Sequence, residues 1–112
     1  MKFKVDYPPS LNSLWRVFRG RSILSRKARE YRKVIQYQAL EQSVTLQDGP
    51  LCVTLHLFRP AKRGDIDNAS KALLDSLNGI AWNDDSQIIE MHLYRGDDKQ
   101  FPRVEINVEA KA

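Results

Sequence analysis

The chain has little cysteine and little histidine, and it has no long apolar run. Cys52 is the only cysteine among 112 residues, which excludes an internal disulfide framework, and no Cys/His cluster suggests zinc. No segment approaches the roughly 20 apolar residues that span a bilayer. Residues 1–6 alternate in charge and lack the apolar core of a signal peptide. We therefore expect a protein of the reducing cytoplasm with no membrane partner.

Size and composition set the next limits. The chain is too short for two cores of ordinary size, so residues 1–112 are predicted to form a single domain. Hydrophobic residues make up 42% and charged residues 29%, which is normal for a folded chain and too apolar for a disordered one. The net charge of +4 is modest. A basic function must therefore be argued from where the charges lie.

The charges are separated along the sequence. Eight of the 18 basic residues lie between Arg16 and Lys33, where Glu30 is the only acid. Arg59, Lys62 and Arg63 then precede a group of five aspartates, which are Asp65, Asp67, Asp75, Asp84 and Asp85. A basic tract that leads into an acidic cluster is what a metal-dependent enzyme acting on phosphates needs. The alternative is that both groups are solvated surface.

Hydrophobic periodicity predicts an α+β fold with the element order β-α-β-α-β-β. The expected strands cover about residues 3–7, 51–58, 89–95 and 104–108, and the expected helices cover about residues 26–42 and 68–78. The first helix has an apolar stripe of Ala28, Tyr31, Ile35 and Ala39. Residues 10–24 are expected to form a loop.

The strand patterns also indicate how the elements pack. Because apolar and polar residues alternate, we expect a mixed four-stranded sheet with two helices packed on one face and the other face partly open. The segment from Leu51 to Gln87 resembles a crossover unit, which predicts parallel pairing of the strands on either side of the second helix. The last two strands are expected to form an antiparallel hairpin.

Two acidic pairs flank the second helix. Asp65 and Asp67 stand at i and i+2 at its start, and Asp84 and Asp85 follow it. The pairs meet only if the segment 81–83 runs back along the helix. Carboxylates brought together repel unless a cation neutralises them, and a set of oxygen ligands suits Mg²⁺ or Mn²⁺ and disfavours zinc.

An ordinary structural role accounts for the same aspartates. An aspartate at a helix start caps free N–H groups, Asp67 and Lys71 are spaced as a surface ion pair, and Asn83 to Ser86 suits a turn. The remaining residues with reactive or stacking side chains are predicted to serve packing. Cys52 reads as a small buried residue, while His56 and His92 show no ligand spacing. Trp82 is expected to pack, and Trp15 is a candidate for base stacking.

Taken together, these motifs resemble the RusA family of Holliday junction resolvases, from about Tyr7 to Ile106. The opening Pro8-Pro9-Ser10-Leu11-Asn12 is similar to the family's Pro-Pro-Ser-x-Asn segment, and Gly20-Arg21, Ser25 and Tyr31 resemble the basic segment that follows. The most specific match is Arg63-Gly64-Asp65-Ile66-Asp67-Asn68, followed by Lys71, Ala72, Asp75 and Leu77. Asp84-Asp85-Ser86-Gln87-Ile88 is similar to the family's Asp-Asp-x-Gln-hydrophobic element.

The resemblance implies a small, homodimeric, Mg²⁺-dependent endonuclease of the kind often encoded by prophages, with Mn²⁺ as a substitute metal. Such enzymes cut four-way DNA junctions by metal-assisted phosphodiester hydrolysis in recombination and repair. Carried over by motif, Asp65, Asp67 and Asp85 match the metal-binding aspartates and Lys71 matches the catalytic lysine. Asp84 matches an acidic neighbour and is an additional candidate ligand.

The DNA backbone would be held by basic residues, because phosphate contacts rest on Lys and Arg. Arg26, Arg29 and Lys33 are spaced at three and four, and so they are expected to line one stripe of the first helix. The full candidate set is Arg16, Arg19, Arg21, Arg26, Arg29, Lys33, Lys62 and Arg63. Arg59, close to Lys62 and Arg63 in the sequence, is expected to hold the DNA backbone together with them. Two alternatives stay open. One is a nuclease for other branched DNA such as flaps, and the other is a DNA-binding module without catalysis.

Overall fold

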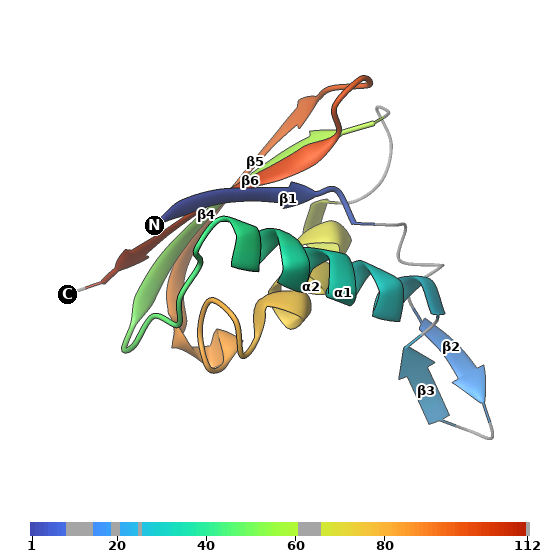
Figure 1. Ribbon diagram of the computed structural model, residues 1–112, viewed down its shortest axis with the longest axis horizontal. Coiled ribbons are helices and arrows are strands. Elements are labelled where there is room, and N and C mark those ends of the chain that lie inside the picture. Colours follow the sequence, from blue (N-terminus) through green and yellow to red (C-terminus); the bar gives the residue numbers. More distant parts are fainter. Residues whose placement is uncertain (9–14, 19–20, 25, 61–65, 112) are drawn as a thin grey trace.

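The computed structural model describes residues 1–8, 15–18, 21–24, 26–60 and 66–111. It contains a four-stranded sheet in the order β1-β6-β4-β5, with α1 and α2 on one face of that sheet (Figure 1). The sheet strands are β1 (Lys2–Asp6), β4 (Leu51–Arg59), β5 (Ile88–Asp97) and β6 (Arg103–Ala110), and the helices are α1 (Arg26–Glu41) and α2 (Ile66–Leu77). The predicted α+β class, with a mixed sheet and two helices on one face, is confirmed.

The central strand β4 organises the sheet. It pairs in parallel with β5 on one edge and antiparallel with β6 on the other. Its inward side chains, Leu51, Val53, Leu55 and Leu57, have at most 1% of their surface exposed, so they form the middle of the core. The parallel β4–β5 pair confirms the predicted crossover, because α2 carries the chain from the end of one strand back to the start of the other.

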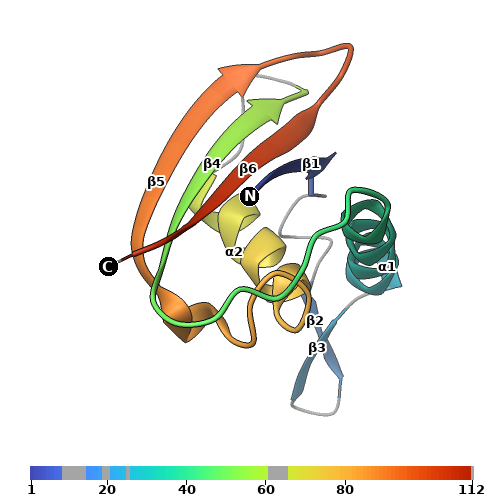
Figure 2. The ribbon, with the colours of Figure 1, turned by 60° about the vertical axis from the view of Figure 1, so that its left-hand side comes forward.

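The expected antiparallel hairpin of the last two strands is wrong. β5 and β6 do not pair, because β4 lies between them and takes a partner on each edge (Figure 2). The connection after β5 therefore passes around the end of β4, where the amide of Asp98 donates a hydrogen bond to the carbonyl of Arg59 at 2.9 Å. The middle of the sheet suits β4 because its inward face is apolar from Leu51 to Leu57, and burying such a face on both edges is favourable.

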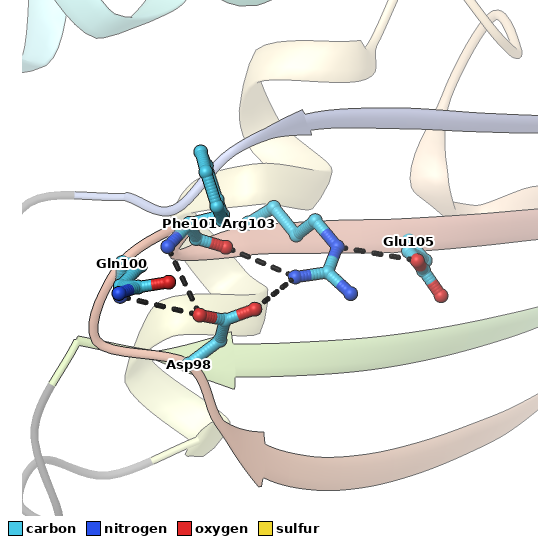
Figure 3. A network of polar contacts seen from close by, with 5 residues as sticks. All are labelled: Asp98, Gln100, Phe101, Arg103 and Glu105. Carbon is cyan, nitrogen blue, oxygen red and sulfur yellow. Dashed lines mark hydrogen bonds and ion pairs between the residues drawn. The ribbon is translucent and has the colours of Figure 1, made fainter.

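A polar network holds this connection in shape. One carboxylate oxygen of Asp98 accepts hydrogen bonds from the backbone amides of Gln100 and Phe101, and the other accepts from Nη1 of Arg103 at 2.8 Å (Figure 3). Nε of Arg103 also donates to Glu105 at 3.2 Å. These contacts fold the segment 98–102 tightly enough for β6 to return beside β4.

The helices bury the stripes expected from the sequence. Ala28, Tyr31, Ile35 and Ala39 of α1 are buried, as predicted. Leu73 and Leu77 of α2 are buried against the same core, which also contains Trp82. The indole of Trp82 is fully buried and donates a hydrogen bond to the side-chain oxygen of Asn78 at 2.7 Å, which confirms its predicted packing role. In the described part of the chain, no helix is long and apolar enough to cross a membrane.

The segment 10–24, expected to be a loop, contains a β-hairpin. β2 (Trp15–Phe18) pairs antiparallel with β3 (Arg21–Leu24), with Trp15 opposite Leu24 and Phe18 opposite Arg21. The hairpin lies beyond the start of α1, away from the four-stranded sheet (Figures 1 and 2). Its signal was short: aromatic and β-branched residues lie on both sides of a two-residue Arg-Gly connection.

Arg59 lies inside the fold. Only 8% of its surface is exposed, and its guanidinium pairs with Asp97 at 3.0 Å across the neighbouring ends of β4 and β5. A buried charge needs such a partner, because removing it from water is costly. Arg59 therefore joins two parallel strands, and the expectation that it holds the DNA backbone with Lys62 and Arg63 is wrong for this residue.

Removing the partner of Arg59 should destabilise the fold. We expect Asp97→Ala to lower the free energy of unfolding by about 1–3 kcal/mol, because the buried guanidinium loses its charged acceptor. Urea unfolding measures the change, and Asp48→Ala, at an exposed aspartate in the loop before β4, is the matched control. A loss at Asp97 no larger than that at Asp48 would contradict this role.

Candidate active site

The chain turns back sharply where α2 ends. Gly79 has a φ of +84°, a left-handed conformation that glycine adopts without strain. The amides of Ile80 and Ala81 both donate to the carbonyl of Leu77 at 3.0 Å, and the amide of Gly79 donates to the carbonyl of Trp82 at 2.7 Å. This reversal, anchored by the buried Trp82, returns the chain toward α2. By the prediction from the sequence, the two acidic pairs meet only if residues 81–83 run back along the helix, and the chain does turn back there.

Asp85 and Lys71 line the same hollow as a result. The hollow has a volume of about 250 Å³ and lies between α2, β5 and the short 3-10 helix η2 (Asp85–Gln87). Its described lining is Ser70, Lys71, Leu74, Asp85, Met91 and Leu93. One carboxylate and one ammonium group therefore face a partly apolar wall. In such surroundings a charge interacts with its neighbours more strongly than it does in open water.

Asp84 has a different role in the turn. It is the N-cap of η2, and its carboxylate accepts a hydrogen bond from the amide of Ser86 at 3.3 Å. Hydrogen bonding from the side chain of Ser86, and then from its amide, lowers the pKa of Asp84. The side-chain oxygen of Gln87 accepts from the amides of Asn83 and Asp84 in return, which completes a capping box. Asp84 is not among the described residues that line the hollow.

Gln87 fixes the position of this turn. Its side-chain nitrogen donates to the carbonyls of Gln47 and Gly49, both at 3.0 Å. The turn is thus attached to the loop before β4 as well as closed on itself. Each residue of the Asp-Asp-x-Gln element therefore has its own role. Asp84 caps η2, Gln87 attaches the turn to the loop before β4, and Asp85 is held at the hollow.

Asp75 is a further acidic residue near this site, and the sequence reasoning gave it no role. It lies four residues after Lys71 on α2. Partial burial raises the pKa of Asp75, the charge of Asp85 raises it further, and the charges of Lys71 and Arg32 act in the opposite direction. Arg32 of α1 also donates a hydrogen bond to the carbonyl of Asp75 at 3.1 Å. The signal in the sequence was the i, i+4 spacing of Asp75 from Lys71.

The other candidate acids and bases lie partly outside the described residues. Asp65, Arg19, Lys62 and Arg63 are outside them, while Asp67 is the second residue of α2, four positions before Lys71. Arg16 lies in β2 and Arg21 in β3. The structure thus brings Asp85 to Lys71 and Asp75, and a meeting with Asp65 and Asp67 stays a prediction.

The predicted basic stripe of α1 is exposed. Arg26, Arg29 and Lys33 all face solvent, and Arg26 pairs with Glu30 one turn later at 3.0 Å. An exposed pair of this kind contributes little to stability and leaves the side chains accessible. Arg32, on the same helix, connects this basic helix with α2 through its bond to Asp75.

Comparison with known proteins identifies the family. The family described as Endodeoxyribonuclease RusA matches residues 6–109. The chain is 33% identical over 98 residues to the crossover junction endodeoxyribonuclease rusA of Enterobacteria phage HK97, covering 85% of this chain and 82% of the relative. It is 27% identical over 110 residues to the proteins of that name from Shigella sonnei and Enterobacteria phage 82, covering 93% of this chain and 89% of each relative.

The chain therefore belongs to the RusA family, and its enzyme class is that of an endodeoxyribonuclease. The family predicted from the sequence motifs is confirmed.

The crowding of Asp75 and Asp85 has a consequence for stability. A carboxylate whose folded pKa is raised destabilises the fold when it is ionised, and this effect is lost as the pH falls through the raised value. We expect Asp75→Asn to raise the melting temperature at neutral pH in EDTA. The gain should vanish as the pH approaches the ordinary carboxyl value of 3.8. Thermal unfolding across this pH range measures it.

Asp48→Asn removes an equal charge from an exposed loop and serves as the control. A gain for Asp75→Asn that is absent at neutral pH, or that persists unchanged in acid, would show that Asp75 does not carry an unfavourable charge in the fold.

Proposed function

We propose that this chain resolves four-way DNA junctions by metal-assisted hydrolysis of a phosphodiester. The observation that carries the proposal is the presence of Asp85 and Lys71 in the lining of one hollow, beside Asp75, in a member of the RusA family. The names of the relatives describe crossover junction endodeoxyribonucleases, which supports a junction as the substrate.

The donor set fits a divalent cation. Asp85 contributes carboxylate oxygens at the hollow. Partial burial raises the pKa of Asp75, and the charge of Asp85 raises it further; a cation bound beside them would offset this negative charge. We propose that Asp65, Asp67 and Asp85 hold Mg²⁺, for which Mn²⁺ can substitute, because hard cations prefer carboxylate oxygens. A divalent cation bound there supplies Lewis-acid stabilisation of the negative charge that develops on the phosphate.

The chain's own residues do the remaining work. Lys71 is exposed at the hollow, so its ammonium can contact the scissile phosphate and neutralise the charge that grows in the transition state. The charge of Asp75, which interacts with Lys71, helps to keep that ammonium near the acidic group. Asp84 is assigned a capping role, since its carboxylate already accepts a hydrogen bond from the turn.

The DNA backbone is assigned to the basic residues of α1 and the β2–β3 hairpin. Arg26, Arg29 and Lys33 offer exposed charges on α1, and Arg16 and Arg21 belong to the hairpin that extends beyond its start. Arg19, Lys62 and Arg63 complete the proposed set. Binding of this kind depends on phosphate contacts and weakens steeply with salt.

We also propose that the enzyme acts as a homodimer in the cytoplasm, with residues 1–112 as one RusA-like endonuclease domain in each subunit. A dimer with two-fold symmetry can present two active sites to two strands of a junction that is itself nearly two-fold. Two of the relatives are phage proteins, which supports a prophage origin, and their name, crossover junction endodeoxyribonuclease, supports a role in DNA recombination and repair.

The decisive experiment compares three DNA substrates. Matched four-way junction, flap and linear duplex should be incubated with the protein, with Mg²⁺ or with EDTA. We expect Mg²⁺-dependent cleavage of the junction in preference to the other two. Preferred cleavage of the flap would keep the nuclease and change its substrate, while binding without cleavage in any metal would leave only a DNA-binding module.

Substitutions of Asp85 and Lys71 should both reduce cleavage but differ in their effect on Mg²⁺ binding. We expect Asp85→Asn and Lys71→Ala each to slow junction cleavage by at least about a hundredfold, the scale of losing one transition-state stabiliser. Mg²⁺ should raise the melting temperature of the wild type and of Lys71→Ala, but not of Asp85→Asn, because only the aspartate is a proposed ligand. Cleavage assays and thermal unfolding with and without Mg²⁺ measure both effects.

The neighbouring aspartate supplies the matched variant for this pair. Asn is as good an N-cap as Asp, so Asp84→Asn should keep both the turn and the cleavage activity. Equal losses in Asp84→Asn and Asp85→Asn would make Asp84 a ligand as well, and near-normal turnover of Lys71→Ala would return Lys71 to a surface role.

The basic stripe should control binding and its salt dependence. Changing Arg26, Arg29 and Lys33 to Ala should weaken junction binding with little dependence on base sequence. Each lost phosphate contact should reduce the slope of log affinity against log salt by about 0.9. Binding titrations at several salt concentrations measure the slope. A triple variant of Lys2, Lys4 and Lys99, all exposed and outside α1, loses the same charge and is the control.

Superimposable slopes for the stripe variant and the wild type would remove this stripe from the DNA-binding surface. Equal losses in the stripe variant and the control would attribute the effect to net charge alone.

A further inference from the structure

The face of the sheet that the helices leave uncovered carries a second group of potential ligands. Cys52 of β4 is directly opposite Glu90 of β5, and the next outward pair along these strands is Thr54 and His92. Side chains of one strand alternate between faces, so Glu90 and His92 point the same way. Among the described residues, Cys52, Glu90 and His92 are the cluster whose ligand atoms all lie within 4.8 Å of one another.

Hydrogen bonds already draw these side chains together. The thiol of Cys52 donates to Oε2 of Glu90 at 3.1 Å, and Nε2 of His92 lies 3.4 Å from the same oxygen. The expectation that Cys52 is a small buried residue is therefore wrong, since it is partly exposed and joined to a carboxylate. These contacts lower the pKa of Glu90 to about 2, with the Cys52 hydrogen bond as the largest cause, so this carboxylate is ionised at neutral pH.

We propose that Cys52, Glu90 and His92 form a Zn²⁺ site on the uncovered face of the sheet. One thiolate, one imidazole and one carboxylate are a donor set that suits zinc and is far softer than the oxygen ligands preferred by Mg²⁺. Zn–ligand bonds of about 2.0–2.3 Å place tetrahedral ligand atoms about 3.3–3.8 Å apart. Two of the three separations, 3.1 Å and 3.4 Å, are already near these values.

The charges around the cluster also suit a cation. Ionised Glu90 and a thiolate at Cys52 together balance the charge of Zn²⁺, and the proton of the thiol passes to solvent when the Zn–S bond forms. Glu109 lies opposite Cys52 on β6 and adds negative charge. Nζ of Lys111 is 3.3 Å from Oε2 of Glu90, so a bound metal would replace the Lys111 ammonium as the cation next to that oxygen. Solvent takes the fourth coordination position.

The site would couple two strands that also shape the active site. Met91 and Leu93 alternate with Glu90 and His92 along β5, and they line the hollow of Asp85 and Lys71 on the helix side. A metal held by β4 and β5 would fasten the edge strand to the central one. Because the site depends on the folded sheet, bound Zn²⁺ should raise the melting temperature by mass action, whether or not the nuclease is active.

The test is a calorimetric titration of the reduced full-length protein with Zn²⁺ in excess Mg²⁺, which occupies the carboxylate centre. We expect one Zn²⁺ per chain and a matching rise in melting temperature. Cys52→Ser and His92→Gln should each weaken Zn²⁺ binding by more than about tenfold, since even the loss of outer partners of a metal site costs 10–100-fold. The serine hydroxyl can still donate to Glu90, so Cys52→Ser should fold normally.

His56→Gln is the matched control, because His56 is the other histidine and lies on the neighbouring strand β4, stacked on Phe58. It should bind Zn²⁺ as the wild type does. With Co²⁺ as a second probe, the thiolate-to-cobalt absorption should appear in the wild type and in His56→Gln and be absent in Cys52→Ser. Unchanged Zn²⁺ affinity in both ligand variants, or no heat from the wild type, would overturn the proposal. Either result leaves the nuclease proposal intact.

Discussion

The fold depends on the burial of β4 between two strands of opposite direction. Because Leu51, Val53, Leu55 and Leu57 fill the middle of the core, β4 must have a neighbour on both edges. The parallel neighbour, β5, can be reached only by a crossover, and α2 provides it. The chain then has to return from the end of α2 to the start of β5. That return is what carries Asp85 to the side of Lys71.

In the segment 82–87, which returns the chain from α2 to β5, some residues hold the turn in place and Asp85 lines the hollow. Trp82 is buried, Asp84 caps the turn, and Gln87 attaches it to the loop before β4. Asp85, between these anchors, is held at the hollow. Partial burial raises the pKa of Asp75, and the charge of Asp85 raises it further. Concentrated negative charge is unfavourable for a fold by itself, and the cation of the proposed function would neutralise it.

Strand β5 serves two surfaces at once. Met91 and Leu93 form a wall of the hollow, while Glu90 and His92 point to the uncovered face and meet Cys52. As an edge strand it has fewer neighbours than β4, and Ile89 and Met91 remain 61% and 41% exposed. Its position relative to β4 rests on the parallel ladder between the two strands, and the Arg59–Asp97 ion pair adds a side-chain contact at one end. Contacts on either face of β5 can thus influence the shape of the site.

Local periodicity allowed the sequence alone to determine the helices, the four sheet strands and the parallel crossover, and the resemblance of the motifs around Asp67 and Asp85 indicated the family. The buried stripe of α1 and the packing of Trp82 followed from the same patterns. The order of β5 and β6 did not, because the strand patterns cannot say which edge of β4 each strand occupies. The β2–β3 hairpin was missed because four residues on each side give too short a pattern. The grouping of Cys52 with His92, and of Asp85 with Lys71 and Asp75, was decided by tertiary structure, since strand register and a chain reversal bring together residues that are distant in sequence.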